Sequence, residues 1–322
     1  MTAPAPSQHL RALLMLVLAN LFWGLSFPVI KSIMLLHGLL LGEEGTWFST
    51  LYTVAPRFVI AAVILFALYP GAWRMTRAEL VQGTAIGLFA AAGLLFQNDA
   101  LHYTTASTSA FLTQFYAITI PVWLALRARR NPGAIVWTSC ALVLAGVAIL
   151  GGFDWRTLRL GRGEWETLLA SLFFMGQILW LGKAEYAGNR PERITLVMFV
   201  VQALLFSALA GVTAPGPEAV LKPWTSLPWL GLTAMLAVLS TLGSYLLMNR
   251  WQPKITPTEA GLIYCIEPIF ATVLALFLPG LFSAWALIHY PNERATWTLL
   301  VGGGLITAAN VLLQLKFTRR KS

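Results

Sequence analysis

The sequence is poor in charge. Asp, Glu, Lys and Arg together make up 11% of its 322 residues, whereas soluble globular domains carry about 25%. Hydrophobic residues make up 57%. A chain with so few charges cannot cover a surface that faces water. The composition therefore argues against a soluble domain and indicates a protein embedded in a lipid bilayer.

The sequence also lacks most chemical motifs. Its two cysteines, Cys140 and Cys265, form no CxxC pair, which argues against a disulfide framework or a thiolate metal site. No G-x-x-x-x-G-K-[ST], HExxH or GxSxG occurs. The four histidines are scattered over loops and span ends: His9, His37, His102 and His289. We expect no cofactor, no metal and no ATP-driven step. A membrane-embedded enzyme is the alternative from another class.

Ten hydrophobic stretches of membrane-spanning length fill the chain. A helix needs about 20 apolar residues to cross the hydrocarbon core, and unpaired backbone amides in lipid are costly, so each stretch is expected to be helical. Continuous rather than alternating apolarity argues against a transmembrane β-barrel. The predicted spans are residues 11–31, 52–70, 80–100, 106–126, 133–152, 164–183, 194–213, 228–249, 257–278 and 296–317.

The second five stretches repeat the first five. Leu-Ala-Asn-Leu-Phe at 18–22 recurs as Leu-Ala-Ser-Leu-Phe at 169–173, which is a shift of 151 positions. Because five is an odd number, the second copy must lie inverted in the bilayer, as in many secondary transporters. We predict an all-α integral membrane protein of ten transmembrane helices, in two inverted five-helix repeats (1–152 and 164–322) around a central cavity.

The basic residues indicate the orientation of the chain. If the N-terminus is inside, most of the 22 Lys and Arg residues fall in inner segments, as the positive-inside rule requires. The outer loop fits this orientation least well, because it carries Arg156, Arg159 and Arg162. We expect a multi-pass protein of the plasma (inner) membrane with both termini cytoplasmic. Topology then explains the net charge of +9, so no nucleic-acid partner is expected.

The longest connections are predicted outside, at 32–51, 214–227 and 279–295. Relative to the repeat, 279–295 carries extra residues, which form either a short interfacial helix or an ordered outer loop. The inner loops are short, which leaves little room for a cytoplasmic catalytic or nucleotide-binding module.

The first span carries a mixed polar and aromatic face. Asn20, Trp23, Gly24 and Phe27 follow the i, i+3, i+4, i+7 spacing and share one side of the helix. Gly24 allows another backbone to approach closely. A polar Asn beside a Trp suits a helix that lines a cavity. The alternative is that Trp23 faces lipid.

Four motifs in order carry a family resemblance. Phe-Trp-Gly-Leu-Ser-Phe at 22–27 resembles the F-W-G-x-x-F opening of EamA-type members of the drug/metabolite transporter superfamily. Residues 57–62 resemble the R-F-x-x-A of their second helix, 106–113 their fourth helix, and Glu267-Pro268 the E-P of their ninth. The resemblance implies ten helices in two inverted repeats around a substrate cavity. Family members commonly export amino acids or related metabolites. This chain departs from them in its longer outer loops.

Glu267 is the strongest single candidate for a functional residue. It falls near the middle of the ninth predicted span, where a carboxylate is costly and therefore functional by default. Burial disfavours its charged form, which suits a proton carrier or a ligand for a substrate ammonium. The alternative is a protonated strut that links helices. Tyr116, 151 positions earlier, is its partner in the first repeat.

Mirrored polar residues end the third and eighth spans and are predicted to act as gates. On the outside, Arg57 is expected to pair with Asp99. On the inside, Arg250 or Lys254 is expected to pair with Glu259. The alternative is that these charges face water and gate nothing. The gate candidates are Arg57, Asn98, Asp99, Asn249, Arg250 and Glu259.

The predicted cavity is aromatic and carries a single charge. Its candidate residues are Asn20, Trp23, Phe27, Gln114, Tyr116, Gln177, Tyr264 and Glu267. Every Lys and Arg is predicted at a span end or in a loop, which argues against phosphorylated substrates, since these need basic groups deep in the site. An aromatic lining suits neutral, zwitterionic or cationic organic molecules.

We therefore expect a secondary transporter that exports small amphipathic metabolites, such as neutral or aromatic amino acids, by alternating access. Its partners are a small-molecule substrate and the lipid bilayer. A flippase for a lipid-linked carrier is the closer alternative and requires a lateral opening. The chain is expected to be a monomer or a homodimer, because the glycines at 302–304 permit close helix contact within or between subunits.

Overall fold

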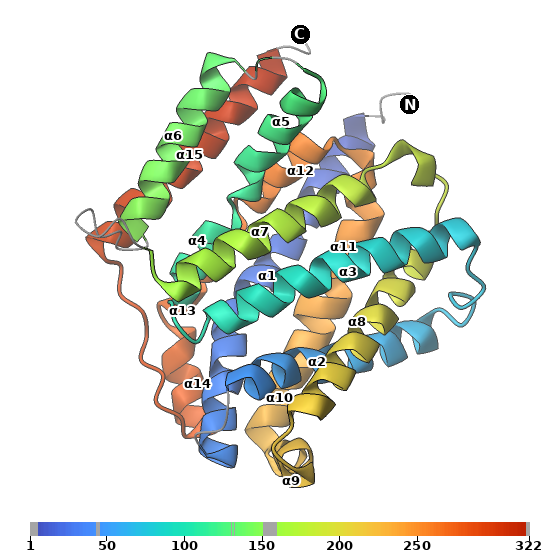
Figure 1. The fold of residues 1–322 in the computed structure, drawn as a ribbon, viewed down its shortest axis with the longest axis vertical. Helices are drawn as coiled ribbons and strands as arrows, with labels where there is room; N and C mark the ends of the chain where they lie inside the picture. The colour runs from blue at the N-terminus through green and yellow to red at the C-terminus, as the bar shows by residue number, and fades with distance from the viewer. Residues whose placement is uncertain (1–5, 43–45, 130, 132, 151–159, 320–322) are drawn as a thin grey trace.

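The fold was analysed in a computed structural model that describes residues 6–42, 46–129, 131, 133–150 and 160–319. Within these residues all regular structure is helical (Figure 1). The longer elements are α1 (Pro6–Leu41), α2 (Thr46–Leu68), α3 (Arg77–Ala100), α4 (Ala106–Thr113), α5 (Tyr116–Arg127), α6 (Ala134–Leu150), α7 (Arg162–Leu181), α8 (Pro191–Thr213), α9 (Pro217–Leu221), α10 (Leu227–Met235), the π-helix η3 (Leu236–Gly243), α11 (Ser244–Trp251), α12 (Pro257–Tyr264), α13 (Glu267–Ala275), α14 (Leu278–Ala286) and α15 (Trp297–Arg319). Three short 3₁₀ turns connect them: η1 (Ala184–Tyr186), η2 (Lys222–Thr225) and η4 (Gln252–Lys254).

Several helices are long and apolar enough to cross a bilayer. Among the described residues there are six such segments, or seven if α13 and α14, which are bent by 52° to one another, count as one span. The six are α1, α2, α3, α4 with α5, α8, and α10 with η3, α11 and η4. Shorter apolar helices occur within α6 and α15. The part of the chain that the structure describes is thus all-helical, and the protein is a multi-pass membrane protein.

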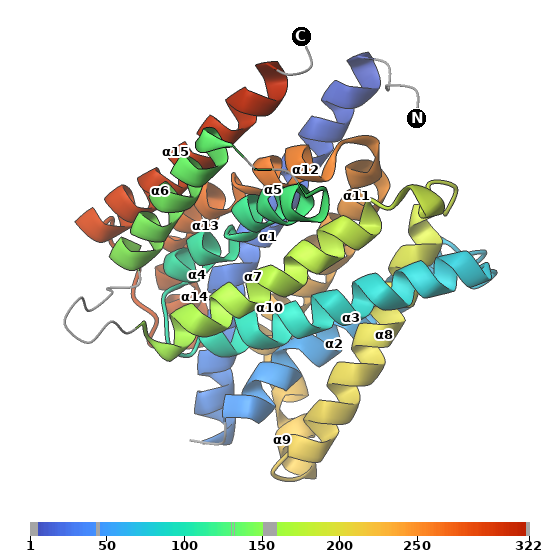
Figure 2. The same cartoon turned by 45° about the horizontal axis from the view of Figure 1, so that its top comes forward.

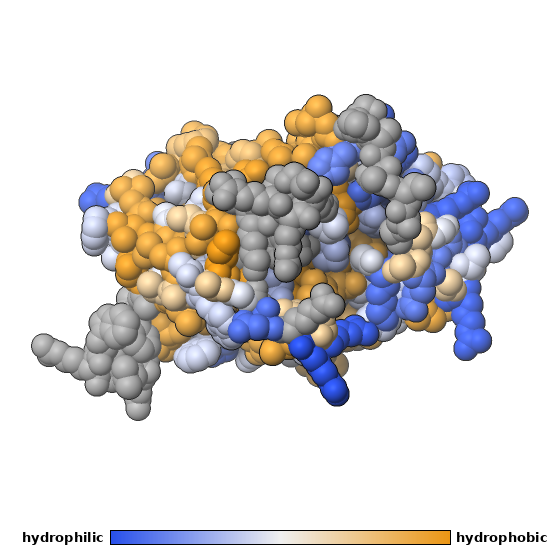
Figure 3. Space-filling view, turned by 90° about the horizontal axis from the view of Figure 1, so that it is seen from above, coloured by the Kyte–Doolittle hydropathy of each residue, from blue (hydrophilic) through white to orange (hydrophobic). Residues whose placement is uncertain are grey.

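The outward faces of the helices are apolar. Val63 is 63% exposed, Leu204 68% and Leu300 62%, which a water-facing surface seldom tolerates over wide areas. The end-on view in Figure 3 shows apolar residues over much of one side, while hydrophilic residues gather toward the other. The start of α1 and the end of α15 lie at the same end of the molecule in Figures 1 and 2. Lipid contact explains the exposed apolar surface.

Two predicted connections contain helix. α1 continues to Leu41, so most of the expected outer loop at 32–51 is helical. The physical reason is that this stretch stays apolar and buries Ile33 and Leu36. In the expected connection 279–295, α14 forms a helix and buries Phe282. Arg156 and Arg159 of the predicted outer loop lie outside the described residues, whereas Arg162 is the first residue of α7.

Two predicted spans are broken at matching positions. The fourth breaks between α4 and α5, after Thr113, and the ninth breaks between α12 and α13, after Tyr264. These two positions differ by 264 − 113 = 151, the shift of the sequence repeat. At each break the backbone makes a tighter turn: Gln114 N donates to Phe111 O at 3.2 Å, and Ile266 N to Ile263 O at 3.1 Å. The eighth predicted span is also irregular, because η3 interrupts it; π-helical turns often occur at functional sites.

Gly24 brings α1 close to α13, as its position in the sequence predicts. A Cβ atom added at Gly24 would lie 2.8 Å from Phe270 Cβ and 2.9 Å from Ala271 N. Real Cβ atoms do not approach so closely, so only glycine fits. The contact fixes the height and rotation of the helix that begins at Glu267.

Gly24→Ala should therefore destabilise the protein. Overpacking a tight helix contact costs about 1–3 kcal/mol, and the helical backbone of α13 cannot move away without displacing Glu267. Gly38→Ala, also on α1, is the matched control, because an added Cβ there meets nothing within 4 Å. Thermal unfolding of the detergent-purified protein should give a lower midpoint for Gly24→Ala and an equal or higher one for Gly38→Ala. Equal midpoints for the two variants would contradict the tight contact.

Candidate functional site

A cavity lies where the two broken helices meet their neighbours. It is bordered by α1, α2, α3, α7, η3 and α11 as well as by both breaks. Its lining residues are Trp23, Ser26, Arg57, Leu94, Gln97, Thr113, Tyr116, Phe174, Gln177, Ile178, Ser240, Tyr245, Met248, Tyr264 and Glu267. Both halves of the chain contribute, so the cavity is central rather than confined to one half.

Aromatic rings in edge contact form one wall of the cavity. Trp23 lies 5.5 Å from Tyr245 and 5.5 Å from Tyr264, centroid to centroid, and Tyr264 lies 6.4 Å from Tyr116. All three contacts are edge-to-face, the arrangement that ring quadrupoles favour. The Tyr264 hydroxyl donates to Gln252 Oε1 at 2.8 Å, which fixes its ring. The wall is therefore apolar in area and held in place from several helices.

Glu267 lies at the break of the ninth predicted span and faces the cavity. Its side chain is buried, and its Oε2 accepts a hydrogen bond from Gln114 Nε2 at 3.3 Å. Among the described residues no Lys, Arg or His forms an ion pair with it. A buried carboxyl without a cation favours the neutral form, and a cation that enters the cavity favours the charged form. Glu267 is therefore the candidate residue for binding a cation in the cavity.

The structure brings most of the predicted cavity residues together. Trp23, Tyr116, Gln177, Tyr264 and Glu267 line the cavity, and Gln114 reaches it through Glu267. Asn20 and Phe27 do not line it.

Asn20 and Phe27 are packed among helices instead. Asn20 Nδ2 donates to Leu16 O of its own helix at 2.6 Å, and Phe27 is buried in the apolar core. The reason is that Gly24, on the same face of α1, packs against α13. The open part of α1 is therefore the edge formed by Trp23 and Ser26.

The prediction for Arg57 is wrong. It does not pair with Asp99 at the outer surface, because Asp99 binds Arg162. α2 begins at Thr46 rather than at residue 52, so Arg57 lies about three turns into the helix rather than near its start. It is 2% exposed and borders the cavity. The expectation that every basic residue lies at a span end fails at the same position.

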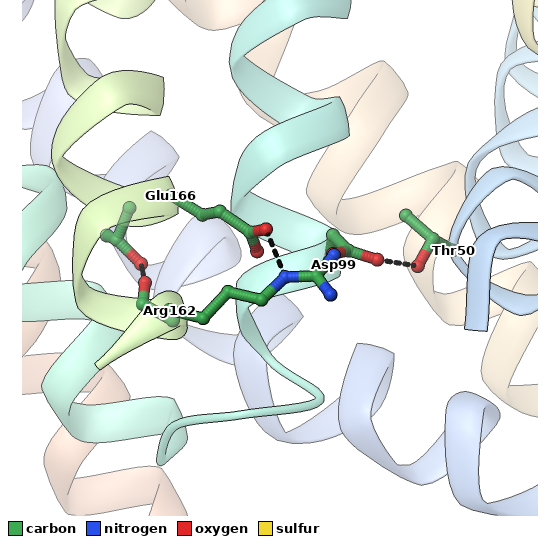
Figure 4. Close-up of polar contacts among 6 residues, drawn as sticks. Thr50, Asp99, Arg162 and Glu166 are labelled. Atoms are coloured by element: carbon green, nitrogen blue, oxygen red, sulfur yellow. Dashed lines mark hydrogen bonds and ion pairs between the residues drawn. The ribbon is translucent and has the colours of Figure 1, made fainter.

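The Asp99 carboxylate, which is fully buried, joins three helices (Figure 4). Thr50 Oγ1 of α2 donates to its Oδ1 at 3.0 Å, and Arg162 Nη2 of α7 lies 2.6 Å from its Oδ2. Arg162 Nε also donates to Glu166 at 2.6 Å, and its guanidinium lies 4.3 Å from the Tyr103 ring centroid. We call Thr50, Asp99, Arg162 and Glu166 the Asp99 cluster. It connects the end of α3 to the start of α7.

A second ion pair lies at the opposite end of α3. Arg193 Nη1 of α8 donates to Glu79 Oε2 at 3.2 Å, and the Arg190 backbone N–H donates to Glu79 Oε1 at 3.1 Å. Sequence reasoning missed this contact. The available signal is the capping box of Thr76 and Glu79, which fixes the carboxylate at the helix start.

The remaining gate candidates lie in different surroundings. Arg250 Nη1 is 4.0 Å from Glu192, and Glu259 Oε2 accepts the backbone N–H of Thr256 at 2.9 Å as an N-terminal cap of α12. The Asn98 side chain is buried and donates to Leu94 O at 2.7 Å. Asn249, also buried, donates to Thr195 Oγ1 at 2.9 Å. Asn249 therefore ties α11 to α8 inside the protein, whereas Asn98 bonds within its own helix, α3.

Sequence reasoning also missed several lining residues, among them Ser26, Gln97, Thr113 and Met248. A signal was present. Adding 151 to 26, 97 and 113 gives 177, 248 and 264, which are all lining positions as well.

Comparisons with known proteins agree with this architecture. Residues 10–152 match the family model of the EamA-like transporter family. An uncharacterized transporter of Archaeoglobus fulgidus is 25% identical over 275 residues, which cover 84% of this chain and 78% of the relative. A solved crystal structure, described only as that of a protein, is similar over 94% of this chain and 99% of its own, with a TM-score of 0.57 and 17% identity.

The family match confirms the resemblance that the sequence motifs predict. Together with the relative's name, it supports a multi-pass membrane transporter rather than an enzyme. The structural similarity, at this low identity, concerns the fold alone.

Arg162→Ala should destabilise the protein. It removes the cation that contacts the buried Asp99 carboxylate, and leaving a buried acceptor without its partner costs about 1–3 kcal/mol. Arg250→Ala is the control, since the Arg250–Glu192 pair is long and more exposed, and such pairs contribute about 0–1 kcal/mol. Thermal unfolding in detergent should separate the two variants clearly. Arg162→Ala with the midpoint of Arg250→Ala would show that the Asp99 cluster contributes little stability.

Proposed function

We propose that this protein is a secondary transporter that moves small amphipathic solutes across the plasma (inner) membrane by alternating access. Neutral and aromatic amino acids are the solutes that best match an aromatic cavity with one acidic group. Both termini are proposed to lie in the cytoplasm, and export is the proposed direction. The two repeats, 1–152 and 164–322, would lie inverted to one another around the cavity.

The observation that carries this proposal is the pairing of cavity residues across the repeat. Of the lining residues, most occur in pairs that are 151 positions apart. The pairs are Trp23 with Phe174, Ser26 with Gln177, Leu94 with Tyr245, Gln97 with Met248, Thr113 with Tyr264, and Tyr116 with Glu267. A cavity built from equivalent positions of both copies lies on the axis that relates them. Transporters with inverted repeats bind their substrates at that place.

Helix packing supports the same arrangement. If the first five predicted spans correspond to the second five, α3 is equivalent to η3 with α11, and α1 is equivalent to α7. The contact of α3 with α7 should then recur as a contact of η3 and α11 with α1, and all these contacts occur. Likewise, α13 packs on α1 as α5 packs on α7, and α12 packs on α1 as α4 packs on α7. The repeat maps α2 onto α8 and α6 onto α15, so each of these two contacts is its own equivalent. Both pairs pack closely. α3 with α7, and α6 with α15, are visible as neighbours in Figures 1 and 2.

The two ends of α3 supply candidate gates. Asp99 at its C-terminal end binds α7, and Glu79 at its N-terminal end binds α8. Both contacts join the first half of the chain to the second. Opening one contact while the other persists would expose the cavity to one side of the membrane at a time.

Glu267 provides a route for energy coupling. An empty cavity favours its protonated form, and a substrate ammonium favours its carboxylate. Binding of the solute on the inside would then release one proton from Glu267, and release of the solute outside would take one up. This exchange would couple export to proton entry.

Counterflow in proteoliposomes tests the transport proposal. Vesicles that hold the purified protein would be preloaded with one unlabelled solute from a panel of neutral and aromatic amino acids, organic cations, purines and a sugar phosphate, and offered the labelled form outside. We expect accumulation of an aromatic or neutral amino acid, with at least a tenfold loss in Tyr116→Ala, as for removal of a substrate-positioning group. Accumulation of no panel member above empty vesicles would contradict the proposal and favour the lipid-linked alternative.

The coupling role of Glu267 predicts a specific change in pH dependence. The wild-type protein should drive solute movement when a pH gradient is imposed, whereas Glu267→Gln should lose this response, because an amide cannot release a proton. Glu218→Gln is the matched control, since Glu218 is exposed in the connection that contains α9. Uptake would be measured with and without the gradient. An unchanged response in Glu267→Gln would rule out Glu267 as the proton carrier.

A further inference from the structure

We propose that Arg57 binds a carboxylate group of the carried solute and so selects carboxylate-bearing solutes over plain amines. This inference rests on the proposed transport function, which it makes more specific. It concerns a residue that the sequence placed at the surface and the structure places on the cavity wall.

Arg57 is a buried guanidinium within a helix. It lies in the interior of α2, with 2% of its surface exposed, and borders the cavity. The charge therefore faces the cavity rather than bulk water. Taking such an ion out of water carries a penalty of several kcal/mol, which a partner must offset.

The described residues supply no anionic partner for this charge. Arg57 Nε and Nη1 are buried and have no hydrogen-bond acceptor, and no carboxylate of the described residues lies within ion-pair distance. The guanidinium is 5.1 Å from the Phe58 ring centroid, a contact that offsets only part of the penalty. Arg162 and Arg193, by contrast, each bind a buried carboxylate. The missing partner of Arg57 is an anion that enters the cavity.

The chemistry of the cavity favours a carboxylate as that anion. A guanidinium presents parallel N–H donors whose spacing fits the two oxygens of a carboxylate. A phosphate monoester brings a charge of about −1.5 to −2, which a single arginine cannot balance in a cavity that also contains Glu267. One arginine and one acid together match a solute that carries one negative and one positive group.

The aromatic wall runs between the two charged residues. Phe58, next to Arg57, lies 6.1 Å from Tyr245, which contacts Trp23, which in turn contacts Tyr264. Tyr264 and Glu267 flank the same helix break. A solute held by its carboxylate at Arg57 would therefore lay its apolar part along the rings of Tyr245, Trp23 and Tyr264, which line the cavity.

The repeat identifies the informative substitution. Aligning the second predicted span on the seventh matches Arg57 with Met198, a shift of 141, so the equivalent position of the second copy is neutral. Met198 is fully buried. Arg57→Met thus introduces a side chain that the equivalent site already accommodates, which limits the risk of misfolding.

The test compares three ligands that differ only at the carboxylate: phenylalanine, phenylalanine amide and phenethylamine. Binding to the purified full-length protein would be followed by tryptophan fluorescence, since Trp23 lines the cavity, and transport by counterflow. A hydrogen bond to a charged group contributes about 1.5–3 kcal/mol, so the wild type should prefer phenylalanine over its amide roughly tenfold or more. Arg57→Met should abolish this preference, and Arg57→Lys should keep part of it. Arg127→Met, at an exposed position of α5, should behave as the wild type.

The ratio of phenylalanine binding to phenylalanine amide binding separates a loss of recognition from a loss of stability, because general damage to the protein weakens the binding of all three ligands alike. An undiminished ratio in Arg57→Met would overturn the inference and leave the transport proposal standing. Equal transport of phenethylamine and phenylalanine by the wild-type protein would also overturn the inference and leave the transport proposal standing. Stronger competition by phenyl phosphate than by phenylalanine would replace the carboxylate with a phosphate and also overturn it. Counterflow of no panel member would instead contradict the transport proposal itself.

Discussion

The cost of an unpaired charge in an apolar interior organises this protein. A bilayer offers no water to solvate a buried ion, so each charged group must find a partner or mark a place where a partner arrives. Asp99 and Glu79 have found theirs in Arg162 and Arg193, and these pairs hold the ends of α3. Arg57 and Glu267 have no ionic partner among the described residues and both border the cavity. The division between satisfied and unsatisfied charges thus separates the scaffold from the candidate site.

Close helix packing determines where the unsatisfied charges lie. Gly24 allows α1 to touch the backbone of α13, and that contact positions the helix break from which Glu267 projects. The edge contacts of Trp23 with Tyr245 and Tyr264 then extend from the same helix across the cavity. One side of α1 therefore serves both as a packing surface and as a cavity wall. A change on this helix affects the shape of the site even where it touches no solute.

The sequence predicted the class of the protein well because hydrophobic length and repeat spacing are strong signals. The helical fold and the resemblance carried by residues 22–27 depended on these signals, and the family match confirms the resemblance. Residue roles were harder to predict, because they depend on helix rotation and on where each helix begins. Arg57 was misplaced since α2 starts before the predicted boundary, and Asn20 since its face of α1 packs instead of opening. The lining residue Thr113 was missed, although its repeat partner Tyr264 was named; applying the repeat to every candidate would have found it.

The placement of the two ion pairs on a single helix has a mechanical consequence. Glu79 and Asp99 lie at opposite ends of α3, and at 1.5 Å per residue the distance along the helix axis is about 30 Å, the thickness of a hydrocarbon core. α3 is an uninterrupted helix, unlike the two broken spans beside the cavity. We expect such a rod to behave as a lever, whose two ends move in opposite directions when it tilts. A leak through both sides at once would then require the lever to bend, so the straightness of α3 would itself protect the membrane gradient.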